Sequence, residues 1–163
     1  GTTEINDFSD PPEATFVITY SGGKTDVYNS KLRHIKRNGT VCSLYNVPNP
    51  NAIDGFNLRL TNTSSKSGIL RGTLRTMDGT VLFNNELLLA EGETIVPNQT
   101  IRLTHDDIDA INVAAGNDSG WPGRAVLTIS SDVTSMEMFG LIRSNAGGPL
   151  TNMSVGASGN GCD

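Results

Sequence analysis

The 163-residue sequence is poor in charge, in aromatic side chains and in long apolar runs. Charged residues make up 18% of it, below the roughly 25% of an average globular protein. Seventeen acidic residues outnumber twelve basic ones, so the chain lacks the basic excess that nucleic-acid-binding proteins carry. Its longest apolar runs, such as the one around residues 87–89, fall far short of the about 20 residues that a membrane-spanning helix needs. We therefore expect neither a nucleic-acid partner nor a membrane span.

Cysteine is also scarce, with Cys42 and Cys162 as the only two. Two cysteines so far apart in sequence can form neither a zinc finger nor a Cys-x-x-Cys redox motif. We expect a disulfide between them, within one chain or between two chains, and two free thiols are the alternative. Because disulfides persist in oxidising compartments, this pairing predicts an exported protein, extracellular or on a cell surface.

What the chain does contain is a series of short apolar or β-branched segments, spaced at the roughly 8–12 residues typical of antiparallel sandwiches. Phe56, Leu58 and Leu60 alternate strictly with polar residues, which places them on one face of a strand. Asp78-Gly79 predicts a hairpin turn, and Thr104 can cap one short helix. The predicted fold is all-β, an antiparallel β-sandwich of about eight or nine strands with one short helix.

The composition along the chain predicts three parts. Residues 1–13 form a polar, acidic N-terminal arm, residues 14–157 the sandwich domain, and residues 158–163 a Gly/Ser-rich tail. The arm carries two apolar side chains, Ile5 and Phe8, which could dock on a neighbouring subunit. The alternative is that the arm folds back on its own domain.

Several segments resemble a β-sandwich module found in exported bacterial proteins. They are residues 56–63, 72–74 with 78–79, 104–108, 121–125, 138–144 and 150–154, and the likeness covers roughly residues 40–155. The resemblance implies the fold and export, and it implies an accessory or surface domain. It brings no catalytic motif with it.

Catalytic patterns are missing from the sequence. The only histidines are His34, among cations, and His105, beside three acids where a helix begins. Neither a Gly-x-Ser-x-Gly nucleophile elbow nor a phosphate-binding Gly-x-x-x-x-Gly-Lys loop occurs. We therefore expect no enzyme.

Two groups of residues suggest ligands. Asp106, Asp107 and Asp109 could supply oxygen ligands to calcium, although no group of acids follows an EF-hand spacing. Trp121 precedes Pro-Gly at the end of a loop, so its indole could serve as a glycan platform, with Asn117 and Asp118 beside it. The alternatives are solvated acids for the first group and a buried plug over one end of the sandwich for Trp121.

Taken together, these features favour an extracellular structural subunit that self-associates through its N-terminal arm and sheet edges, as a filament or surface layer. The alternative is an adhesion module that binds a glycan or a cell surface, assisted by calcium. No cofactor other than calcium is expected.

Overall fold

In the computed structural model, the residues that can be described are 13–31, 39–145, 147–153 and 162. The chain divides into two compact units, Gly1–Asn38 and Gly39–Asp163. The predicted domain boundaries are therefore wrong at the N-terminal side, because the strand expected to open the sandwich at residue 14 belongs to the first unit.

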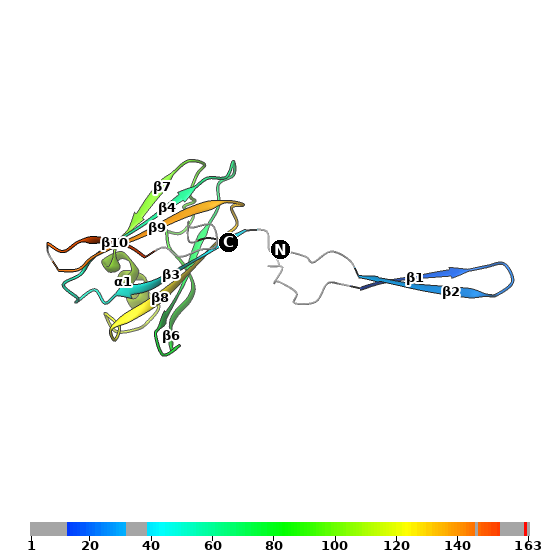
Figure 1. Ribbon diagram of the computed structural model, residues 1–163, viewed down its shortest axis with the longest axis horizontal. Helices are drawn as coiled ribbons and strands as arrows, with labels where there is room; N and C mark the ends of the chain where they lie inside the picture. Colours follow the sequence, from blue (N-terminus) through cyan, green and yellow to red (C-terminus); the bar gives the residue numbers. More distant parts are fainter. Residues whose placement is uncertain (1–12, 32–38, 146, 154–161, 163) are drawn as a thin grey trace. The chain divides into compact units, whose positions relative to one another are not determined.

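The first unit contains an antiparallel hairpin of β1 (Glu13–Thr19) and β2 (Thr25–Lys31), visible in Figure 1. The connection at residues 20–24 is closed by two hydrogen bonds of 2.9 Å, in which the backbone amides of Tyr20 and Gly23 donate to the carbonyls of Lys24 and Tyr20. Gly23 has φ +76°, which a residue without a Cβ adopts readily. Because of this turn, β1 pairs over seven residues with β2, the next strand in sequence. The pairing of β1 therefore needs no strand of the sandwich.

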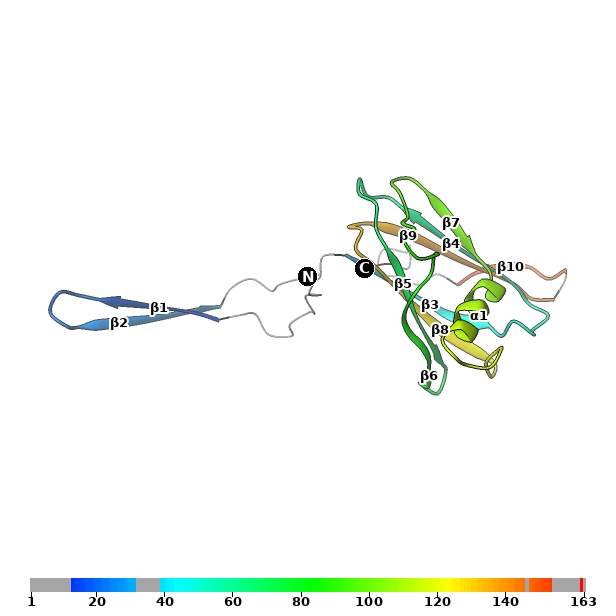
Figure 2. The ribbon, with the colours of Figure 1, turned by 180° about the vertical axis from the view of Figure 1, so that it is seen from behind.

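The second unit contains two four-stranded antiparallel sheets, with strand orders β3-β8-β5-β6 and β10-β9-β4-β7 (Figures 1 and 2). Their strands are β3 (Thr40–Pro48), β4 (Gly55–Asn62), β5 (Leu70–Thr76), β6 (Val81–Leu87), β7 (Thr100–Leu103), β8 (Arg124–Ser131), β9 (Met136–Arg143) and β10 (Leu150–Asn152). The predicted all-β antiparallel sandwich with one short helix is confirmed.

One continuous core joins the two sheets. Phe56, Leu58 and Leu60 on β4 are buried, as their alternation predicted, and they belong to the same cluster as Leu127 of β8 in the other sheet. Close approach between the sheets depends on Gly140 of β9. A Cβ added there would lie 2.3 Å from Cδ1 of Leu44 on β3, so a side chain at this position would displace the buried Leu44 side chain or the strands that carry the two residues.

The helix α1 (His105–Ala114) connects β7 in one sheet to β8 in the other. Thr104 caps it as predicted, since its hydroxyl accepts a hydrogen bond from the Asp107 amide at 3.3 Å. The Asp107 carboxylate in turn accepts from the Thr104 amide at 2.7 Å, which completes a capping box. The helix ends shortly before Gly116, which has φ +94°.

A disulfide joins Cys42 and Cys162 within one chain, across 120 residues of sequence. Both cysteines are buried, and the two residues form an isolated antiparallel bridge at the free side of β3. The predicted pairing is therefore present, and it attaches the end of the chain to an edge of the β3-β8-β5-β6 sheet. The rest of the predicted tail lies outside the described residues.

Candidate functional site

Trp121 is a core residue and does not form an exposed aromatic platform. Its side chain is 3% exposed, and its indole Nε1 donates to the carbonyl of Val47 at 3.4 Å. The side-chain amide of Asn49 donates to the carbonyl of Trp121 and fixes the loop around it. The predicted glycan contact at Trp121 is therefore wrong, because a buried indole cannot stack on a sugar.

Asn117 and Asp118 hold the segment that follows α1. The Asn117 side-chain amide donates to the carbonyl of Leu82 at 2.6 Å. The carbonyl of Asp118 accepts from the buried Asn112 side chain at 2.9 Å. Through these contacts both residues stabilise the loop that follows α1. Because Trp121 is buried, Asn117 and Asp118 do not lie beside an exposed aromatic ring that could bind a glycan.

The three acids proposed as calcium ligands are engaged separately. Asp107 belongs to the capping box, and Asp109 accepts from the Ser119 hydroxyl at 2.6 Å and from the Gly120 amide at 2.7 Å. Asp106 lies 3.7 Å from Nε2 of His105. Across the part of the chain that is described, no three His, Cys, Asp or Glu side chains come together as a metal-ion site. The expectation of a calcium site at Asp106, Asp107 and Asp109 is therefore not supported by their geometry.

Ile5 and Phe8, the predicted assembly residues of the arm, lie outside the described residues. Within the described residues, no helix combines the length and the apolarity needed to cross a bilayer.

The β1–β2 hairpin presents an apolar surface that the sequence did not single out. Phe16 lies opposite Tyr28, and Ile18 lies on the same face of the hairpin as these two residues. Val17 lies opposite Val27 on the other face. All five side chains are exposed, Phe16 at 59%. The apolar character of these residues was visible in the sequence. Their exposure was not, because an apolar strand is normally buried in a sheet.

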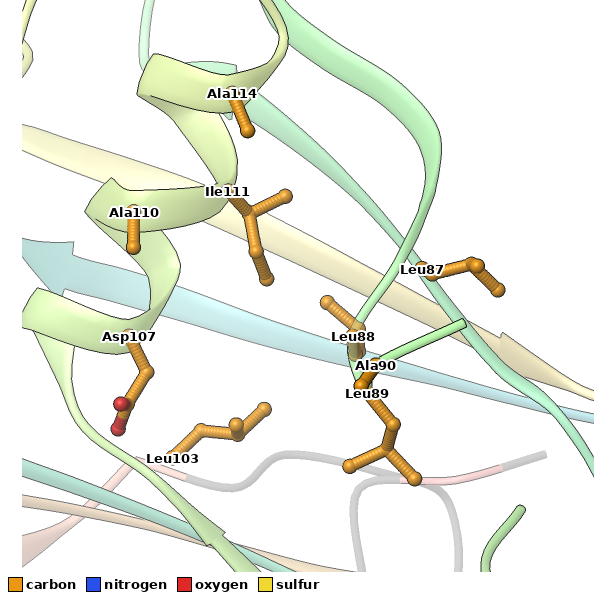
Figure 3. A pocket seen from close by; sticks show the side chains of 9 residues that line it. All are labelled: Leu87, Leu88, Leu89, Ala90, Leu103, Asp107, Ala110, Ile111 and Ala114. Carbon is orange, nitrogen blue, oxygen red and sulfur yellow. The ribbon is translucent and has the colours of Figure 1, made fainter. Parts of the chain in front are cut away.

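An apolar groove runs between α1 and the segment that follows β6 (Figure 3). It has a volume of about 350 Å³ and is lined by Leu87, Leu88, Leu89, Ala90, Leu103, Asp107, Ala110, Ile111 and Ala114. Asp107 is the one charged residue of this lining, and its carboxylate is already used by the capping box. The groove therefore offers aliphatic contact surface, and its lining supplies no group for acid–base chemistry.

Comparison of the chain with protein-family models, with curated proteins and with solved structures found no match. The resemblance of residues 40–155 to a surface module of exported bacterial proteins therefore stays a prediction.

Proposed function

We propose that this protein is an extracellular structural subunit that self-associates, and that the β1–β2 hairpin is the element that contacts a second copy. The observation that carries the proposal is the exposure of the hairpin's large apolar side chains. The disulfide between Cys42 and Cys162 supports the extracellular part of the proposal, because such bonds form in oxidising compartments.

The hairpin exposes six large apolar side chains. The exposed set is Phe16, Val17, Ile18, Tyr20, Val27 and Tyr28. Together these side chains expose roughly 600 Å², at the 150–250 Å² that a fully buried aromatic residue covers and less for the aliphatic ones. A standard protein interface buries about 800 Å² per partner. Because Val17 and Val27 lie on the other face, a contact on the face of Phe16 and Tyr28 supplies only part of such an interface, and the strand edges would add to it.

The backbone of the hairpin favours the same interpretation. A two-stranded hairpin is marginally stable in water at best, and three or more strands or a packed face are needed for stability. Within the described residues β1 and β2 form a two-stranded sheet, so each has one edge without a neighbouring strand. A second copy could cover the face that bears Phe16 and Tyr28 and could add strands to these edges.

The geometry of the contact decides what the subunits build. If two hairpins face each other, the contact is two-fold and closes as a dimer. If the hairpin is received by a different surface of the next copy, the contact repeats and gives the expected filament or surface layer. The native mass distinguishes these outcomes.

The test is the native mass of the full chain by light scattering, for the wild type and for the double variant F16T/Y28T. Threonine keeps the β-propensity and removes the aromatic surface. The matched control is V17T/V27T on the other face. We expect a mass above 17.3 kDa for the wild type and the control, and 17.3 kDa for F16T/Y28T. A monomeric wild type would overturn the proposal, and so would an F16T/Y28T protein that assembles like the wild type. Repeating the measurement with a chelator tests whether calcium assists the contact.

A further inference from the structure

The outer face of the β10-β9-β4-β7 sheet carries three exposed arginines, and two of them are direct neighbours. Along β4, β7 and β9 the residues that alternate with the buried positions point away from the core. Arg59, Arg102 and Arg143 occupy such positions and are exposed. Arg59 lies opposite Arg102 on one neighbouring strand and opposite Phe139 on the other. We call Arg59, Arg102, Phe139 and Arg143 the arginine face.

The charge of the arginine face is opposite to that of its unit. Residues 39–163 contain twelve acidic and seven basic residues, a net charge of −5. The four strands of this sheet contain three arginines and one acid, Glu137. Among the described residues, Arg124 forms an ion pair with Asp54. None of the three arginines of the arginine face forms an ion pair with a described residue. The strands of the other sheet also contain three arginines and one acid, so the number of charges does not distinguish the arginine face. What distinguishes it is that Arg59 and Arg102 lie directly opposite each other on neighbouring strands.

Asn57 lies on the same face and can restrain Arg102. The Asn57 side-chain amide satisfies its neighbours when its oxygen faces Arg102, and in that orientation the oxygen accepts hydrogen bonds from Nη2 and Nε of Arg102 at 3.2 and 2.5 Å. A guanidinium has five N–H groups, so three of them stay available for a partner. The strands beneath are paired over eight residues of β4 and β9, which makes the face a rigid platform. Little ordering is therefore required when a partner binds.

We propose that the arginine face binds an acidic polysaccharide whose sugars carry carboxylate groups. The planar fork of an arginine matches the two oxygens of a carboxylate, and the pair forms charge-assisted hydrogen bonds. Phe139, which is 42% exposed, adds an apolar ring beside Arg59 on which the C–H face of a sugar can stack. The row of Phe139, Arg59 and Arg102 crosses three neighbouring strands and so spans about 10 Å, close to the length of a disaccharide.

A protein partner fits this face less well. The exposed large apolar residues on the sheet's outer side are Phe139 and Leu150. Two partly exposed side chains offer far less apolar surface than the about 800 Å² per partner of a standard interface. The outer face combines three arginines, one ring and polar neighbours with a single acid, Glu137, two residues from Phe139, and this net positive, largely polar surface is complementary to an acidic and hydrated polymer.

The test measures binding of the full chain to polygalacturonate, with dextran as the uncharged comparison, in about 0.1 M salt. At that ionic strength the Debye length is about 10 Å, so acids elsewhere on the unit contribute little. The double variant R59Q/R143Q removes two charges from the face. R71Q/R75Q removes two charges from β5 in the other sheet and is the matched control. F139A removes the ring and keeps the charge.

We expect the wild type to bind polygalacturonate and not dextran. R59Q/R143Q should lose about tenfold or more in affinity, R71Q/R75Q less than about twofold, and F139A several-fold. Equal losses in the two double variants would show binding that depends on total charge alone and would overturn the proposal. Absence of binding by the wild type would overturn it as well. If R59Q/R143Q instead lowers the native mass and leaves polygalacturonate binding intact, the face contacts a second copy and the polysaccharide assignment is wrong.

Discussion

The disulfide between Cys42 and Cys162 allows a quantitative prediction of stability. It closes a loop of 120 residues, which restricts the unfolded chain far more than the folded one. In the chain-entropy treatment a loop of this length stabilises the folded state by about 5 kcal/mol at 25 °C. The variant C162A removes the bond and also the buried Cys162 sulfur, whereas reduced wild-type protein lacks the bond but keeps both sulfurs, so comparing the two separates the loss of the bond from the loss of packing.

The assay is urea unfolding followed by the fluorescence of Trp121, the only tryptophan and a buried one. With an m-value of about 2 kcal/mol/M, a loss of about 5 kcal/mol lowers the midpoint by about 2.5 M. Wild-type protein in a thiol reductant is the control and should unfold at the same urea concentration as C162A under the same conditions. A midpoint of C162A within about 0.5 M of the oxidised wild type would refute the reasoning, because the closed loop would then constrain nothing.

Two further predictions concern packing and acid titration. G140A places a methyl group against Leu44 and should destabilise the sandwich by about 1–3 kcal/mol in urea unfolding. The control is G55A, whose Cβ would meet only Cβ of Arg143 at 3.8 Å, and it should unfold like the wild type. Equal midpoints for both variants would contradict the close approach of β9 and β3. Hydrogen bonds from the Thr76 hydroxyl and the Thr80 amide lower the pKa of Asp78 from its ordinary 3.8. This carboxylate therefore stabilises the folded state fully above pH 3.8, and that stabilisation is lost as the pH falls through the lowered pKa of the folded protein. An NMR titration should show the Asp78 pKa rising in T76V and unchanged in T73V, and a T76V value equal to that of the wild type would remove Thr76 as the cause.

The features that the sequence predicted well depend on neighbours a few residues apart. The alternation of Phe56, Leu58 and Leu60 reports the two-residue period of a strand, and the burial of all three follows from it. Thr104 precedes the helix by one residue, so its capping role is a local property. In each case the physical cause lies within the segment whose pattern was considered.

The features that it predicted poorly depend on partners distant in sequence or on the direction of one side chain. The indole of Trp121 bonds to Val47, 74 residues earlier, and a Pro-Gly loop does not specify whether the ring turns inward. An apolar strand such as β1 has the same pattern whether it joins a sandwich or a separate hairpin. The arginine face depends on the register of β4 with β7 and β9, so Arg59 and Arg102 become neighbours only after the sheet has formed.

The hairpin and the arginine face differ in chemistry, and salt should therefore affect their two proposed contacts in opposite directions. Apolar surface drives the hairpin contact, and salts that are excluded from protein surfaces, such as sulfate, strengthen apolar burial. Charge drives binding at the arginine face, and any added salt screens it. In one series of wild-type samples with rising sulfate, the native mass should increase while polygalacturonate binding weakens. If both rose or both fell together, one driving force would govern both contacts, and the separation of an apolar assembly element from a cationic polysaccharide surface would be wrong.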